Sequence, residues 1–186
     1  MRVVTRDGRV AAAALALAAA LCASCATDPG ADYLWGFGDP VRGAALQAPR
    51  TFGDTSRWAG RPAAAALAAE RLEFLTDQMR TNPRYAPEVN PAVTHQLLEA
   101  RAEMRRFLGI APEAPPELVA PALRRAAEAL RDGSLARAEA ALSGPAFTTG
   151  PLVTLARLGA MPRLPQAAAA AGLAAAEVGR LDRSRR

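Results

Sequence analysis

Apolar residues recur at intervals of three and four along most of the chain, and this spacing limits the possible folds more than any other feature. Over residues 61–80, Ala64, Ala68, Leu72, Leu75 and Met79 follow one another at steps of 4, 4, 3 and 4. Such steps place side chains on one face of an α-helix. No stretch alternates apolar and polar residues in the way a half-buried strand does. The sequence therefore predicts an all-α fold.

Residues 90–109 give the clearest helix signal. Asn90 can cap the first turn, Pro91 suits the first helical position, and Gly109 suits the left-handed conformation that ends many helices. Apolar residues between these ends repeat at helical spacing, from Val93 to Leu108. We expect a helix between these two boundary residues.

The second half of the chain predicts shorter helices. Residues 116–143 are expected to form two helices joined by a turn at 132–133, an αα-hairpin, with a bend or break near Pro121. Ser134 is expected to cap the second helix, and Leu135 to lie on its apolar side. Further helices are predicted at 152–158 and 166–181, the last with Leu173 on its apolar side. Together these segments predict a small irregular bundle of about five or six helices.

The first 26 residues have the layout of an export signal. Arg2, Arg6 and Arg9 precede an uncharged apolar run at 10–21, and small residues follow at 22–26. Basic, then apolar, then small is the order found in secretory signal peptides. We expect this segment to be removed. The alternative is an uncleaved anchor, because residues 10–26 approach the shortest length that spans a bilayer.

Ala23, Ser24 and Cys25, with Leu21 upstream, resemble the lipobox of bacterial lipoproteins, although Leu21 lies one position further from the Cys than in that motif. The resemblance implies a signal peptide over residues 1–24 and a lipid on Cys25. It also implies a membrane-anchored protein facing the periplasm, and Ala26 in place of Asp favours the outer membrane. The alternative is cleavage after Ala26, which would release a secreted, soluble helical binding protein.

Residues 25–60 show no sustained helical or strand period and are rich in Gly, Pro, Asp and Arg, which is typical of a tether or an irregular wrap. Five of the nine aromatic residues of the chain nevertheless lie here: Tyr33, Trp35, Phe37, Phe52 and Trp58. Disordered linkers are poor in aromatic residues. We expect Tyr33, Trp35 and Phe37 to fold back onto the helices. The alternatives are a mobile linker and a set of partner-binding residues made of all five aromatics.

Titratable residues show no pattern specific to a catalytic or metal centre. His95, the only His, shares a helix face with Glu99, but a zinc site usually needs more ligands, so we expect an exposed pair. Glu70, Glu73 and Asp77 follow one side of the first predicted helix and are expected to form a solvated face. An enzyme that uses such carboxylates on a cell-wall polymer is the least favoured alternative. No Cys follows Cys25, so this part of the chain offers no disulfide or thiol nucleophile.

The charge balance disfavours nucleic acid as a partner. All 23 basic residues are Arg, and residues 25–186 carry 20 of them against 17 Asp and Glu, a mild excess for an exported protein. The sequence therefore predicts a non-enzymatic module of the cell envelope without cofactor or metal. Its helical domain covers 61–182 and its basic tail 183–186. The expected partners are the membrane, through the lipid on Cys25, and a protein of the envelope.

Overall fold

Seven α-helices and one short 3-10 helix, η1, make up the part of the chain that the computed structural model describes, residues 38–185. In chain order they are α3 (Pro40–Thr51), η1 (Thr55–Trp58), α4 (Pro62–Thr81), α5 (Pro91–Leu108), α6 (Pro116–Arg131), α7 (Leu135–Ala141), α8 (Pro151–Gly159) and α9 (Pro165–Ser184). The all-α class is confirmed, with seven helices rather than five or six. The predicted signal peptide, Cys25, Tyr33, Trp35 and Phe37 lie outside the described residues.

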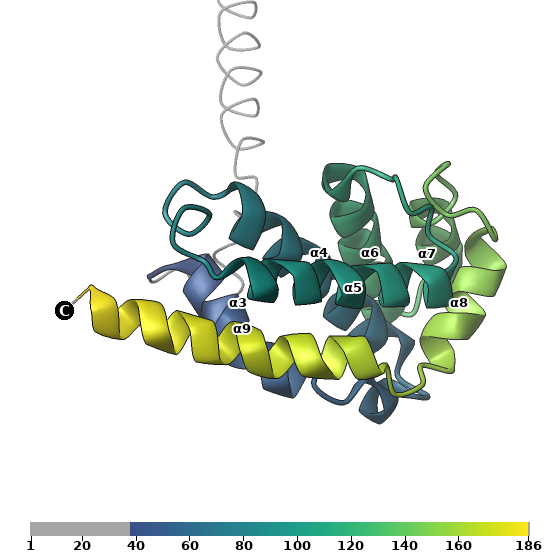
Figure 1. Ribbon diagram of the computed structural model, residues 1–186. Coiled ribbons are helices and arrows are strands. Elements are labelled where there is room, and N and C mark those ends of the chain that lie inside the picture. The colour runs from purple at the N-terminus through teal and green to yellow at the C-terminus, as the bar shows by residue number, and fades with distance from the viewer. Residues whose placement is uncertain (1–37, 186) are drawn as a thin grey trace, which may run out of the picture.

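The helices are arranged around α4, which packs against α3, α5, α6 and α8 (Figure 1). Helices α5 and α9 lie side by side along one face of the molecule, while α6, α7 and α8 gather at one end. Ala65, Ala66 and Ala69 of α4 are fully buried. Because these side chains are small, the neighbouring helices can approach α4 closely. No helix within residues 38–185 combines the length and the apolar character needed to cross a membrane.

Helix α3 corrects the prediction that residues 25–60 lack regular structure. A carboxylate oxygen of Asp39 accepts hydrogen bonds from the backbone N–H groups of Val41 and Arg42 at 3.0 and 3.2 Å, which caps the helix. The core-facing side of α3 is built mostly from Ala, namely Ala44, Ala45 and Ala48. The helix also contains Gly43 and Pro49. Ala has a high helix propensity, but an Ala-rich buried side interrupted by Gly43 gives a weak amphipathic pattern, so burial against α4 and α9 stabilises this element.

The loop after α4 is fastened to the start of α3 by Tyr85. This side chain is buried, and its hydroxyl donates a hydrogen bond to the carboxylate of Asp39. Burial, together with that neighbouring carboxylate, raises the pKa of Tyr85 far above its ordinary value. The contact joins residues that lie 46 positions apart in the sequence.

Helix α5 has the boundaries that its capping residues predict. The side chain of Asn90 accepts a hydrogen bond from the N–H of Ala92 at 2.9 Å, and Gly109 ends the helix at a φ of 76°. A Cβ at Gly109 would collide with the side chain of Thr149, so glycine is needed here for space as well as for conformation.

The predicted αα-hairpin is formed by α6 and α7, which pack against each other, but the break expected near Pro121 and two further local expectations were wrong. Helix α6 continues through Pro121, which is exposed, so the carbonyl that loses its partner lies at a solvated surface. Ser134 occupies the position before α7 without a capping bond from its side chain. Leu135 on α7 and Leu173 on α9 are exposed at 55% and 44%, so neither belongs to the core.

Candidate functional site

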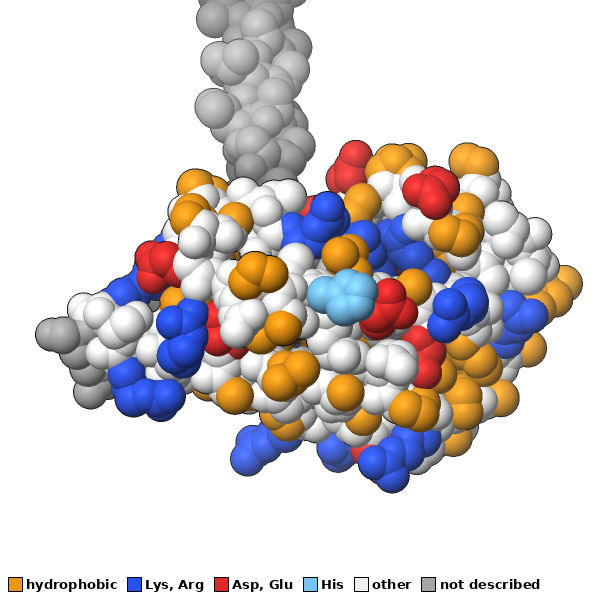
Figure 2. Space-filling view, viewed as in Figure 1, with side chains coloured by type: hydrophobic (Ala, Val, Ile, Leu, Met, Phe, Trp, Pro, Cys, Tyr) orange, Lys and Arg blue, Asp and Glu red, His pale blue; other side chains and the backbone are white. Residues whose placement is uncertain are grey.

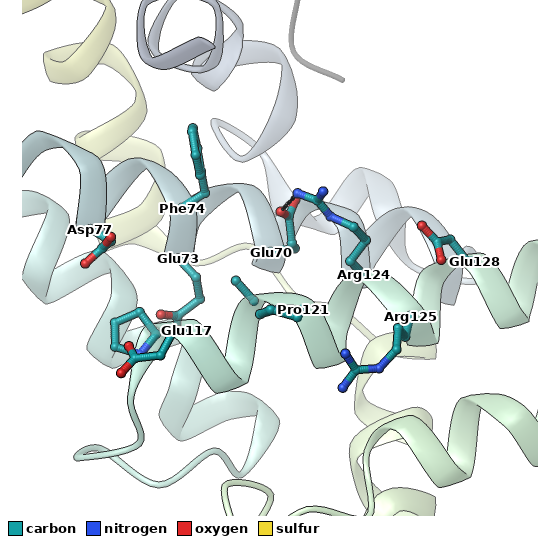
Figure 3. Close-up of a pocket in the computed structure, with 11 residues that line it drawn as sticks. Glu70, Glu73, Phe74, Asp77, Glu117, Pro121, Arg124, Arg125 and Glu128 are labelled. Carbon is teal, nitrogen blue, oxygen red and sulfur yellow. Dashed lines mark hydrogen bonds and ion pairs between the residues drawn. The ribbon is translucent and has the colours of Figure 1, made fainter. Parts of the chain in front are cut away.

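A groove of about 430 Å³ follows the contact between α4 and α6 (Figure 3). Its apolar part is formed by Phe74 of α4 and by Pro116, Ala120 and Pro121 of α6. The charged residues that line it are Glu70, Glu73, Asp77, Glu117, Arg124, Arg125 and Glu128. Figure 3 shows Asp77 and Glu117 toward one end and Arg124, Arg125 and Glu128 toward the other, so the groove has an acidic end and a mixed-charge end.

The carboxylates of Glu70 and Glu73 are buried, which corrects the prediction that they form a solvated face. Their exposed fractions are 1% and 2%. Both oxygens of Glu73 accept hydrogen bonds from the guanidinium group of Arg105, with Nε–Oε1 and Nη2–Oε2 distances of 2.6 and 2.7 Å. Two parallel bonds of this kind are the strongest form of an Arg–carboxylate pair.

Arg105 is itself buried, at 2% exposure, and it forms hydrogen bonds with other groups besides Glu73. Its Nη1 group donates to the backbone carbonyls of Pro112 and Ala114 at 2.7 and 2.8 Å, and more weakly to that of Ala111 at 3.4 Å. These carbonyls belong to the connector between α5 and α6. One side chain therefore fastens α5 to α4 and fixes the connector that leads into the groove wall.

The buried carboxylate of Glu70 forms a second ion pair, with Arg124 of α6, whose side chain is partly exposed. This pair bridges α4 and α6 directly, at the mixed-charge end of the groove. Each buried carboxylate thus has a guanidinium partner. Such pairing is typical of ion pairs that fix the relative position of helices, whereas acid–base catalysis relies on carboxylates whose environments differ.

Arg101 lies on α5 one turn before Arg105. Its Nη1 atom is buried and has no hydrogen-bond partner among the described residues. Burial lowers the pKa of this guanidinium group, and the nearby carboxylates of Glu73 and Asp77 oppose the shift. Arg101 therefore offsets part of the negative charge at the acidic end of the groove, from behind α4.

The two predicted partner-binding aromatics within the described residues have different surroundings. Phe52 is 1% exposed and belongs to the core, so it does not form part of a docking surface. Trp58 is half-buried, and its indole Nε1 donates to the carbonyl of Thr51 at 2.7 Å. Cys25, Tyr33, Trp35 and Phe37 lie outside the described residues, so their predicted roles stay predictions.

His95 and Glu99 are both exposed on α5. Within residues 38–185, no group of three or more His, Cys, Asp or Glu side chains is placed to hold a metal ion. Comparisons with protein-family models, with curated proteins and with solved structures find no match to this chain. The features that bear on function are therefore the groove between α4 and α6 and the N-terminal sequence.

Proposed function

We propose that this protein is a non-enzymatic interaction module of the cell envelope. A lipid on Cys25 tethers it to a membrane, and the groove between α4 and α6 binds an extended segment of an envelope protein. The observation that supports binding most directly is the groove itself, where an apolar wall ends at the carboxylates of Asp77 and Glu117. Sites that combine apolar walls with a few placed polar groups are typical binding sites.

The charges of the groove favour a segment that carries a cationic side chain. Five carboxylates line it against two guanidinium groups. Arg105 neutralises Glu73 from behind, and Arg101 offsets Asp77 in part, whereas Glu117 is exposed at the acidic end. An apolar side chain can pack on Pro121 while a neighbouring Arg or Lys approaches this end.

A groove of this size holds only one or two side chains, so its intrinsic affinity is expected to be weak. The membrane tether compensates, because two proteins confined to one envelope meet at a high effective concentration. The proposed function therefore needs both parts, the anchor and the groove, and each is tested separately.

The groove is tested with two tripeptides, acetyl-Leu-Arg-Leu-amide and acetyl-Leu-Glu-Leu-amide, in an NMR titration of the full chain. We expect the Arg peptide to shift the signals of residues around Asp77 and Glu117, and the Glu peptide to bind at least fivefold more weakly. The double variant Asp77→Asn, Glu117→Gln should weaken Arg-peptide binding by roughly 3–10-fold, since each solvated ion pair contributes up to about 1 kcal/mol. Glu99→Gln, an exposed charge on α5, is the matched control and should bind normally.

Equal binding of both peptides, or unchanged binding by the double variant, would contradict the assignment of the acidic end as the recognition element.

The anchor is tested by growing cells that express the full chain with labelled palmitate. We expect the label on the wild-type protein and on Cys22→Ala, and none on Cys25→Ala, because only the second thiol is the predicted lipid acceptor. A mature chain beginning at Thr27 would instead support the secreted, soluble alternative. A full-length product recovered from the cytosol would contradict export altogether.

A further inference from the structure

A basic surface surrounds η1, away from the groove. We call it the η1 surface and define it by Arg50, Arg57, Trp58, Arg61 and Arg163. Two contacts bring its parts together: the hydroxyl of Thr55 donates to the carbonyl of Pro162, and the N–H of Gly60 donates to the carbonyl of Gly159 at 2.7 Å. The loop before α4 is thereby fixed against the connector between α8 and α9, which places Arg163 beside residues about a hundred positions earlier in the chain.

Positive charge predominates on the η1 surface. All four of its arginines are exposed, and Figure 2 shows Arg side chains projecting along the lower edge of the molecule, where the loop after α3 lies in Figure 1. Asp54 is the acidic residue among them, and its carboxylate accepts hydrogen bonds from the N–H and the hydroxyl of Ser56 at 3.2 and 2.7 Å. These bonds, and the charges of Arg163 and Arg57, hold the pKa of Asp54 below its usual range. The carboxylate of Glu103 accepts hydrogen bonds from the first N–H groups of α9, which follow Arg163 in the chain.

Trp58 adds an amphipathic ring to this charge. Its indole N–H is satisfied by the backbone, while the guanidinium groups of Arg57 and Arg61 lie 4.7 and 5.5 Å from the ring centroid. Such stacking orients guanidinium groups by cation–π attraction. Tryptophan favours the boundary between water and lipid, and guanidinium groups bind phosphate oxygens in a bidentate manner.

We propose that the η1 surface binds the phosphate headgroups of an anionic phospholipid bilayer. Charge complementarity selects this occupant, because a bilayer offers many phosphates in one plane to four arginines that share one surface. The length of chain between Cys25 and α3 is compatible with a bilayer as the binding partner. The 15 residues from Cys25 to Asp39 can span at most about 50 Å, while α3 is about 18 Å long, so a lipid on Cys25 and the η1 surface can meet the same membrane. The interaction extends the proposed membrane tether and does not need the groove.

The test uses the full chain with Cys25→Ala, so that no lipid on Cys25 contributes to vesicle binding. Binding is measured by co-sedimentation with vesicles of phosphatidylcholine alone and of phosphatidylcholine with 30% phosphatidylglycerol, at low and at high salt. We expect tighter binding to the anionic vesicles and a loss of that difference at high salt. Arg57→Gln with Arg61→Gln should weaken the anionic component by about 10–30-fold, since each arginine near such a surface contributes about a factor of five. Arg131→Gln with Arg137→Gln removes the same charge from exposed positions elsewhere and should change it less than twofold.

A second readout tests the position of the contact. In the Trp35→Phe background Trp58 is the remaining Trp, and brominated anionic lipids should quench its fluorescence. Equal losses in the two double variants, or binding without quenching of Trp58, would overturn the proposal. Binding to a short oligonucleotide but not to anionic vesicles would also overturn it and would indicate a different class of partner. Circular dichroism confirms that the variants remain folded.

Discussion

Replacing Arg105 by Ala is expected to destabilise the folded chain by about 3–5 kcal/mol, because it removes the partner of a buried charge. The carboxylate of Glu73 would stay at 2% exposure without a counter-ion, and the carbonyls of Pro112 and Ala114 would lose their donor. Urea denaturation followed by circular dichroism measures the loss. The matched control is Arg137→Ala, whose ion pair with Asp132 is exposed at 63% and 59% and should contribute less than about 1 kcal/mol.

A double variant tests whether the lost stability comes from the unpaired charge of Glu73. Glu73→Leu with Arg105→Met removes both charges and keeps apolar volume, so it should recover much of the stability lost in the single variant. A loss in the single variant no larger than that of the control would mean that Glu73 finds another partner or is not buried in solution.

Replacing Phe52 by Ala is expected to cost about 3–5 kcal/mol, because the ring is 1% exposed and its removal leaves a cavity in the hydrophobic core. The same denaturation experiment measures this value. Leu46→Ala is the control on the same helix, since Leu46 is 43% exposed and should cost less than about 1 kcal/mol. Phe52→Ala should leave binding of the Arg peptide unchanged under conditions where the variant is folded. A stable variant that lost partner binding would restore the alternative in which Phe52 is a docking residue.

Local sequence signals predicted the ends of α5, because its own residues terminate the helix. Asn90, Pro91 and Gly109 set the limits of α5 through interactions within a few residues, and these limits hold in the structure. Helix α3 has a comparable cap in Asp39, but its buried side consists mostly of Ala and is interrupted by Gly43. Burial of such a helix depends on neighbours that are distant in the sequence, so its own residues could not reveal it.

The sequence predicted only part of the candidate site, for the same reason. The spacing of Glu70 and Glu73 correctly places both on one side of α4, but that side was expected to face water. Helix α4 is central, and buried residues cover most of its circumference, from Ala65 to Met79. The partners that make this burial possible, Arg105 and Arg124, lie 32 and 54 positions away, which no local pattern indicates.

The hydrogen bonds from Arg105 to the connector between α5 and α6 also affect the rate and selectivity of the proposed binding in the groove. The guanidinium group holds the segment that leads into α6, and Glu70 holds α6 itself, so the two walls are locked in place before any ligand arrives. A preorganised cleft forfeits little ordering entropy on association and adapts poorly to ill-fitting shapes. Association with the proposed segment should therefore be rapid, and its selectivity should depend on shape complementarity rather than on closure of the groove.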